Sequence, residues 1–218
     1  MGSFLVIGMG RFGSSIATEL YRMKHDVLAL DIDENKADAI VDMVTNVIIG
    51  DAKNEAVLES LSVRDFDCVV VAIASSIEDS ILTTISLKEM GARRIVCKAQ
   101  NDRHAKILSQ IGADRVIRPE YDMGKRAAHS LTRQNIIDYL EISPEFGIIE
   151  IITPGKWVGN SIAKNDLRRK FGITVLAIRR VKTEKIEFLP TAETEIIEGD
   201  LLTVVGAKPN LDKISELK

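Results

Sequence analysis

Cysteine, histidine and long apolar runs are all scarce in this sequence of 218 residues. There are two cysteines and three histidines, and no Cys/His cluster has the spacing of a zinc site. His25, His104 and His129 are scattered with no nucleophile beside them, so we expect surface or helix-end histidines rather than catalytic ones. Cys68 and Cys97 each accompany an apolar run, which is typical of buried structural thiols.

The longest strongly apolar run, residues 68–74, is far too short to cross a bilayer. A formal charge of −3 gives no attraction to nucleic acid or to an anionic membrane. A composition of 45% hydrophobic and 28% charged residues is that of an ordinary soluble globular protein. We therefore expect a cytoplasmic protein without a targeting peptide, which associates with a membrane only through a protein partner.

What the sequence does contain is a glycine-rich loop directly after a short apolar run at residues 4–7. In a Gly-x-Gly-x-x-Gly loop, Gly8 permits a tight turn, Gly10 lets the backbone approach a phosphate, and Gly13 lets the helix pack closely on the strand. The free N–H groups at the start of the helix favour an anionic phosphate. The candidate nucleotide-binding residues of this loop are Gly8, Met9, Gly10, Arg11, Phe12 and Gly13.

A second apolar run, residues 27–31, ends in Asp31-Ile32-Asp33. In a nucleotide-binding α/β fold, an acid at the end of the second strand binds ribose hydroxyls and repels a 2′-phosphate. We assign that role to Asp31, with Ile32 beside it. Asp33 has two open interpretations, a second ribose ligand or the N-cap of a helix that begins at residue 34.

Apolar strand-like runs alternate with amphipathic helices over the first two-thirds of the chain. Strands are expected near 3–8, 27–31, 46–50, 68–73, 94–98 and 115–118, and helices near 12–24, 34–43, 54–61, 77–90 and 102–111. This order predicts a Rossmann-like, doubly wound parallel sheet. At its carboxyl edge Asp51 and Ala52 would border a base, and Ala72, Ile73 and Ala74 would form an apolar wall, unless the alanines simply pack.

The pattern changes after residue 118. Residues 119 to about 140 are expected to form one further helix, a crossover element. A strand at 148–152, a helix at 161–171 that ends at Gly172, strands at 173–181, 185–189 and 200–205, and a helix from about 209 predict a small α+β domain. The expected organisation is a nucleotide-binding domain at 1–118, a crossover helix and linker at 119–142, and a ligand-binding or dimerisation domain at 143–218.

Several motifs along nearly the whole chain resemble the KtrA/TrkA family of regulators of potassium conductance (RCK). The sequence Ile-Gly-Ala-Asp at 111–114, followed by Pro-Glu at 119–120 and Asp-Met at 122–123, is more specific than the glycine-rich loop. Agreement also covers residues 7–16, 81–84, 98–101 and 167–173. The resemblance identifies the first domain as RCK-N and the last as RCK-C.

This resemblance implies a cytosolic regulatory subunit of a bacterial potassium uptake system, peripheral to the inner face of the membrane and not an enzyme. Homodimers would assemble into an octameric ring whose shape depends on bound ATP or ADP, and the ring would gate a membrane subunit of the KtrB/TrkH type. Two alternatives stay open: an RCK regulator that binds NAD(H), and a nucleotide-sensing subunit of another cation transporter.

Three charged residues are expected to lie near the phosphates of the nucleotide. Arg11 follows the second glycine at the start of the helix, where a guanidinium suits bidentate phosphate contact. The resemblance implies that Glu120 approaches the γ-phosphate of a neighbouring subunit through Mg²⁺ or Ca²⁺, which prefer oxygen ligands. Lys98, after the fifth strand, is either a cation near the nucleotide or a lysine that snorkels at a strand end.

The resemblance also implies a cyclic di-AMP site at the dimer interface of the C-terminal domain. The sequence carries Thr174 where some binders carry Asn, and the same apolar residues could serve an ordinary dimer interface. The candidate residues are Arg168, Arg169, Ile173, Ala177, Ile178 and Pro190.

Overall fold

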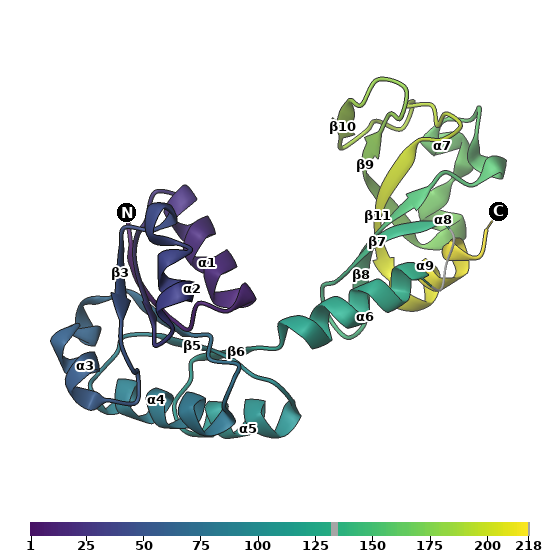
Figure 1. Ribbon diagram of the computed structural model, residues 1–218. Helices are drawn as coiled ribbons and strands as arrows, with labels where there is room; N and C mark the ends of the chain where they lie inside the picture. Colours follow the sequence, from purple (N-terminus) through teal and green to yellow (C-terminus); the bar gives the residue numbers. More distant parts are fainter. Residues whose placement is uncertain (132–134, 218) are drawn as a thin grey trace. The chain divides into compact units, whose positions relative to one another are not determined.

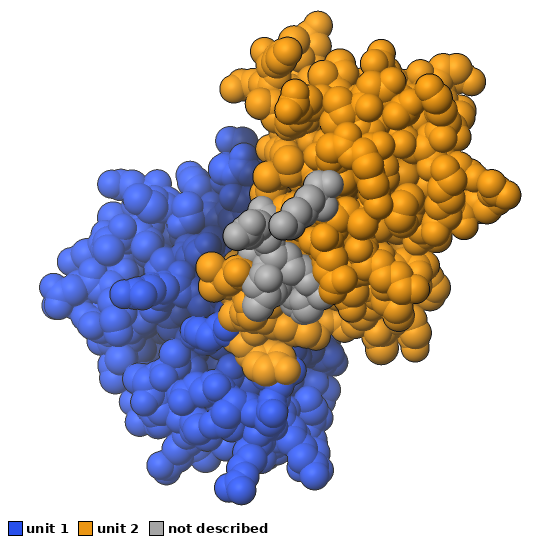
Figure 2. Space-filling model, turned by 90° about the vertical axis from the view of Figure 1, so that its right-hand side faces the viewer, with its two compact units in different colours: residues 1–120 blue, residues 121–218 orange. Residues whose placement is uncertain are grey.

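A computed structural model describes residues 1–131 and 135–217, apart from the side chains of residues 129 and 130. The chain divides into two compact units, Met1–Glu120 and Tyr121–Lys218 (Figure 2). Each unit has its own hydrophobic core.

The first unit is built on a six-stranded parallel sheet of order β3-β2-β1-β4-β5-β6. The order reverses at β1, which has β2 on one side and β4 on the other, so a topological switch point lies between β1 and β4. The expected doubly wound sheet is confirmed. Its strands are β1 (Ser3–Ile7), β2 (Asp26–Asp31), β3 (Asn46–Ile49), β4 (Cys68–Val71), β5 (Ile95–Lys98) and β6 (Arg115–Ile117).

Helices cover both faces of this sheet, with α1 and α2 on one side and α3, α4 and α5 on the other (Figure 1). Successive strand residues alternate between two cores: Leu5 packs with Leu58 and Leu87, whereas Val6 packs with Ala17. Burial on both faces explains the continuous apolar runs. The helices are α1 (Arg11–Arg22), α2 (Glu34–Asp38), α3 (Glu55–Ser60), α4 (Ile77–Glu89) and α5 (Asp102–Gln110), with 3₁₀ turns at Val41–Met43 and Val63–Asp65.

Polar side chains begin several of these helices at the carboxyl edge of the sheet. Asp33 accepts a hydrogen bond from the N–H of Asn35 at 3.1 Å and is the N-cap of α2, as one of its two interpretations predicted. Asn54, Ser76 and Asn101 cap α3, α4 and α5 in the same way. The loops at this edge are therefore held in fixed conformations.

The expected crossover helix over 119–140 is wrong in its second half. Helix α6 (Pro119–Leu131) ends earlier, and β7 (Ile136–Glu141) pairs antiparallel with β8 (Phe146–Ile152). Ile136 and Tyr139 are buried while Ile137 is exposed. A bulge after Ile136 interrupts the alternation of buried and exposed residues that marks a strand, so the apolar spacing in the sequence resembles that of a helix. Pairing with β8 decides its conformation. The boundaries expected at 118 and 142 stay predictions.

The second unit contains a five-stranded antiparallel sheet of order β10-β9-β11-β8-β7. Trp157 and Leu167 pack in its core. The expected helix over 161–171 is two short helices, because Asp166 adopts a left-handed conformation (φ 51°); Gly172 (φ 66°) ends the second, as predicted. The remaining elements are η3 (Gly155–Trp157), α7 (Ile162–Asn165), α8 (Leu167–Phe171), β9 (Ile173–Arg179), β10 (Ile186–Phe188), β11 (Leu201–Ala207) and α9 (Lys208–Ser215).

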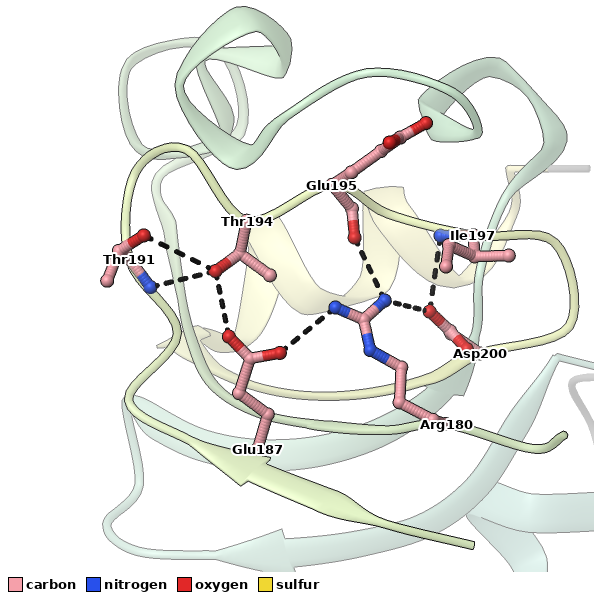
Figure 3. A network of polar contacts seen from close by, with 7 residues as sticks. All are labelled: Arg180, Glu187, Thr191, Thr194, Glu195, Ile197 and Asp200. Atoms are coloured by element: carbon pink, nitrogen blue, oxygen red, sulfur yellow. Dashed lines mark hydrogen bonds and ion pairs between the residues drawn. The ribbon is translucent and has the colours of Figure 1, made fainter. Parts of the chain in front are cut away.

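A polar network fixes the long connection between β10 and β11 (Figure 3). The guanidinium of Arg180 donates to Asp200 Oδ2 at 2.5 Å, to the carbonyl of Glu195 at 2.9 Å and to Glu187 Oε2 at 3.0 Å. Glu187 in turn accepts from the hydroxyl of Thr194 at 2.8 Å. Arg180 therefore holds the irregular connection between β10 and β11 against the end of β9.

Candidate functional site

A pocket opens at the carboxyl edge of the parallel sheet, where β1, β2, β3 and β4 end. This is the edge at which ligands bind in open α/β sheets. Nine of the residues expected to bind a nucleotide line it: Gly8, Gly10, Asp31, Ile32, Asp51, Ala52, Ala72, Ile73 and Ala74. The other lining residues are Ile7, Leu30, Lys36, Gly50, Lys53, Ser75 and Asp79.

The three glycines of the loop are required for different reasons. Gly8 has φ +94°, and a Cβ there would lie 3.0 Å from the backbone nitrogen of Ile73. A Cβ on Gly13 would lie 1.9 Å from the carbonyl oxygen of Gly8, so α1 could not pack against the loop. A Cβ on Gly10 would have no described atom within 4 Å, and Gly10 lines the pocket. Folding therefore requires Gly8 and Gly13, whereas Gly10 leaves room for a ligand.

Asp31 organises the loop as well as lining the pocket. Its buried carboxylate accepts the N–H of Met9 at 2.5 Å and the N–H of Asp33 at 2.8 Å. It thereby joins the glycine-rich loop to the turn between β2 and α2. A carboxylate offers about four acceptor positions, so two remain for ribose hydroxyls.

The charged residues expected around the phosphates lie outside the pocket lining. Arg11 is exposed at the first position of α1. Lys98 is buried at the end of β5, with its Nζ 2.6 Å from Glu120 Oε1 and 5.7 Å from the centre of the Phe12 ring. The hydrogen bond from Lys98 lowers the pKa of the Glu120 carboxyl below its ordinary value. Lys98 thus joins the start of α1 to the first turn of α6.

The structure brings Glu120 to a lysine rather than to other metal ligands. Within residues 1–131 and 135–217, no three His, Cys, Asp or Glu side chains come together in a way that could hold a metal ion. A divalent cation takes six or more oxygen ligands, of which Glu120 alone supplies two at most. Any Mg²⁺ or Ca²⁺ at this position would need its other ligands from phosphate, water or another subunit.

The histidines and cysteines have structural environments. His104 is buried in the first turn of α5, accepts the N–H of Gln100 at 3.3 Å, and has its pKa lowered by burial. His25 accepts the N–H of Gly2 at 3.0 Å. Burial raises the pKa of the Cys97 thiol to about 11, and Cys68 is also buried, as predicted. The side chain of His129 lies outside the described part of the chain.

Sequence reasoning missed several residues of the pocket, most notably Lys53 and Asp79. Lys53 Nζ lies 3.3 Å from Asp79 Oδ1 and 4.0 Å from Asp51 Oδ2. Lys53 directly follows the Gly50-Asp51-Ala52 turn, which indicated from the sequence that it could line the pocket. Its pairing with Asp79 depends on the fold. Gln100 was also missed; its side-chain amide donates to the carbonyl of Ala74 at 2.9 Å and supports the pocket wall.

The residues expected to bind cyclic di-AMP do not form one exposed surface in this chain. Ile173 and Ile178 are buried in the core of the second unit, and Ala177 is buried on β9. Arg168 and Arg169 are exposed on α8, where Arg169 pairs with Asp166 at 2.6 Å. Pro190 lies at the start of the β10–β11 connection and is partly buried. The second-messenger site stays a prediction.

None of the helices in the described part of the chain has the length and apolar character needed to pass through a bilayer.

The TrkA-N domain family matches residues 4–119, and the TrkA-C domain family matches residues 147–218. The Ktr system potassium uptake protein C of Bacillus subtilis is 43% identical over 213 residues, which cover 98% of this chain and 96% of that protein. Protein A of the same system in the same organism is 43% identical over 210 residues, covering 96% and 94%. Protein A of Vibrio alginolyticus is 31% identical over 208 residues, covering 95% and 94%.

Two solved structures share the fold at low sequence identity. The GsuK channel superposes with a TM-score of 0.71 at 18% identity, covering 99% of this chain and 39% of that chain. The GsuK RCK domain superposes with a TM-score of 0.69 at 18% identity, covering 99% and 47%. This chain therefore spans less than half of each of these chains, and the likeness concerns the fold.

Proposed function

Because the chain belongs to the TrkA-N/TrkA-C family and is a potassium-uptake regulatory subunit of the Ktr kind, we propose that it senses adenine nucleotides. The bound nucleotide would then gate a membrane potassium transporter. The observation that carries the proposal is that Gly10 and Asp31 line the same pocket. Gly10 leaves space for a phosphate at the start of α1, and Asp31 offers a carboxylate to ribose hydroxyls. A nucleotide with an unphosphorylated ribose fits both.

The residues that would sense the number of phosphates lie outside the pocket lining. Arg11 stands exposed at the start of α1, where its guanidinium can reach a terminal phosphate. Lys98 is a buried cation whose Nζ lies 5.7 Å from the centre of the Phe12 ring, and it is paired with Glu120. A γ-phosphate would compete with Glu120 for Lys98. Because a ligand shifts a conformational equilibrium only through its different affinities for the two states, this competition would distinguish ATP from ADP.

Glu120 connects this competition to the rest of the protein, because it lies in the first turn of α6, which continues into the second unit. A change at Glu120 would reach the second unit along α6. In an assembled ring, a released Glu120 would be free to meet a divalent cation on a neighbouring subunit's nucleotide.

Assembly into dimers and an octameric ring on the cytoplasmic face of the membrane is part of the proposal. Its support in this chain is a set of exposed apolar side chains on the hairpin of β7 and β8. Ile137, Leu140, Ile142 and Phe146 are 44%, 50%, 56% and 51% exposed there. Exposed apolar side chains gathered on one hairpin are typical of a subunit contact. Copurification from the native host would identify the membrane subunit.

An NAD(H)-binding regulator is the alternative, because the same pocket would accept the adenosine half of a dinucleotide. One structural relative is the GsuK channel bound to NAD, whose TM-score is 0.70 at 18% identity. An NAD-dependent enzyme is disfavoured, since hydride transfer needs an acid or base beside the nicotinamide, and His25 and His104 are engaged in backbone hydrogen bonds.

Calorimetry with ATP, ADP and NADH tests the proposal. We expect the wild-type protein to bind ATP and ADP with different affinities, and both Arg11→Ala and Glu120→Gln to reduce that difference. Arg11→Ala removes a cation that faces the terminal phosphate, whereas Glu120→Gln removes the competitor for Lys98. If both variants keep the wild-type ratio of ATP to ADP affinity, the sensing mechanism is wrong. If only NADH binds, the alternative replaces it.

A further inference from the structure

One ion pair joins two walls of the pocket that belong to distant strands. Lys53 follows β3, and Asp79 lies in the first turn of α4, which follows β4. Strands β2 and β1 separate β3 from β4 in the sheet, so the ends of these strands are about 14 Å apart at three strand spacings. Lys53 Nζ nevertheless lies 3.3 Å from Asp79 Oδ1. The pair therefore spans the pocket from one wall to the other.

Local hydrogen bonds hold both partners in place. The backbone N–H of Lys53 donates to Asp51 Oδ1 at 2.9 Å, and the backbone N–H of Asp79 donates to the hydroxyl of Ser76, the N-cap of α4, at 3.1 Å. The side chains keep moderate exposure, 41% for Lys53 and 29% for Asp79. Asp79 first, and then Asp51, raise the pKa of the Lys53 amine above its ordinary value. The pair is thus formed by side chains whose backbones are already fixed.

The position of the pair along the pocket indicates which part of a ligand it contacts. Phosphate belongs next to Gly10 at the start of α1, and ribose belongs next to Asp31 at the end of β2. The loop after β3, with Asp51 and Lys53, lies one strand further along the sheet. The third part of a nucleotide, its base, therefore lies nearest to the loop of Lys53, and the ion pair brings the carboxylate of Asp79 to the same end of the pocket.

We propose that the Lys53–Asp79 pair is a retaining bar across the base end of the pocket, which slows the release of every adenine nucleotide regardless of its number of phosphates. The inference rests on the proposed function and assigns a positioning role to two residues that take no part in phosphate sensing. The bar separates two properties of the site: Arg11, Lys98 and Glu120 set the preference between ATP and ADP, and Lys53 with Asp79 sets how long either stays bound.

The test is a chase experiment on the full chain. Radiolabelled ATP or ADP is bound to the protein and released into excess unlabelled nucleotide, for the wild type, Lys53→Met, Asp79→Asn and the double variant. An exposed ion pair contributes little, so we expect release to become about two- to fivefold faster. The factor should be the same for ATP and ADP. The double variant should release no faster than the faster single variant, because either change removes the same interaction.

Lys36→Met is the matched control. Lys36 also lines the pocket, but it pairs at 3.4 Å with Asp33, on its own helix turn, so its pair does not span the pocket. Lys36→Met removes one positive charge from the lining of the same pocket, as Lys53→Met does. Equal acceleration in Lys36→Met and Lys53→Met would mean that charge alone matters and would overturn the bar.

Three further results would overturn it: unchanged release in Lys53→Met, additive effects in the double variant, or different factors for ATP and ADP. A wild-type protein that retains no adenine nucleotide would overturn both the bar and the proposed function. Failure of the bar alone leaves the calorimetric difference between ATP and ADP intact, so the two failures are distinguishable.

Discussion

At the scale of single residues, Gly10 and Gly13 belong to one motif but have opposite surroundings. A Cβ on Gly13 would overlap the carbonyl oxygen of Gly8, at 1.9 Å, whereas the space around a Cβ on Gly10 is open among the atoms that the structure describes. The motif therefore combines a packing requirement with a binding requirement. Substitution by alanine separates the two, because the added methyl group is the same.

We expect Gly13→Ala to destabilise the first unit by about 2 kcal/mol or more, since the backbone must move to accept the methyl group. Gly10→Ala should leave the melting temperature of that unit unchanged and weaken nucleotide binding at least tenfold, because the methyl group occupies the phosphate position. Thermal denaturation and calorimetry measure the two effects. The single tryptophan, Trp157, lies in the core of the second unit, so its fluorescence transition should not move in either variant.

If Gly10→Ala binds ATP and ADP as the wild type does, then Gly10 does not face the phosphate; if it unfolds the first unit, then folding also requires Gly10.

Asp31, also at the scale of single residues, both lines the pocket and fixes the glycine-rich loop. Its place at the end of the second strand predicts a ribose ligand from the sequence alone. Its two hydrogen bonds to the N–H groups of Met9 and Asp33 depend on how the loop folds back, and no spacing in the sequence indicated them. Likewise Lys53 follows β3 and Asp79 lies in the first turn of α4 after β4, and these strands are not adjacent, so only the sheet order brings the two residues together.

At the scale of elements, Glu141 on β7 connects three segments of the second unit. Its carboxylate pairs with Lys125 of α6 and lies 2.7 Å from Lys208 at the start of α9. Hydrogen bonds from these two lysines lower its pKa to about 2, from an ordinary value of 4.5. Because the folded-state pKa is lowered, the stabilisation is complete above pH 4.5 and is lost as the pH falls toward about 2.

We therefore expect Glu141→Gln to melt below the wild type at pH 6, and the difference to shrink between pH 4.5 and pH 2. Trp157 fluorescence reports on this unit and measures the melting temperature directly. A difference that stays constant down to pH 2 would mean that the carboxylate charge contributes nothing through the lysines.

The helices and strands differ in whether a sequence pattern is sufficient to predict them. The six parallel strands could be predicted because burial on both faces gives each a continuous apolar run between helical segments. Strand β7 could not, since Ile136 and Ile137 continue the apolar spacing of α6 and a bulge breaks their alternation. Its hydrogen-bonding partner, β8, comes later in the chain and decides its conformation. The break between α7 and α8 depends on a left-handed Asp166, which is uncommon for a residue other than glycine.

At the scale of the whole molecule, the pocket and the second sheet belong to different units. All residues that line the pocket lie within Met1–Glu120, and the five-stranded sheet lies within Tyr121–Lys218. Helix α6 spans the boundary, with Glu120 in its first turn. Helix α6 is therefore the covalent connection through which a nucleotide signal can pass to the second unit of the same chain.

We propose that the number of phosphates on a bound adenine nucleotide controls potassium transport. The most direct measurement is potassium flux into vesicles that contain the membrane subunit copurified with this protein, with ATP or ADP supplied on the side of the regulatory subunit. We predict fluxes that differ about tenfold between the two nucleotides, within the usual range of coupling between sites, and a difference that Arg11→Ala abolishes. Equal flux with ATP and ADP in the wild-type complex would show that the number of phosphates does not control transport.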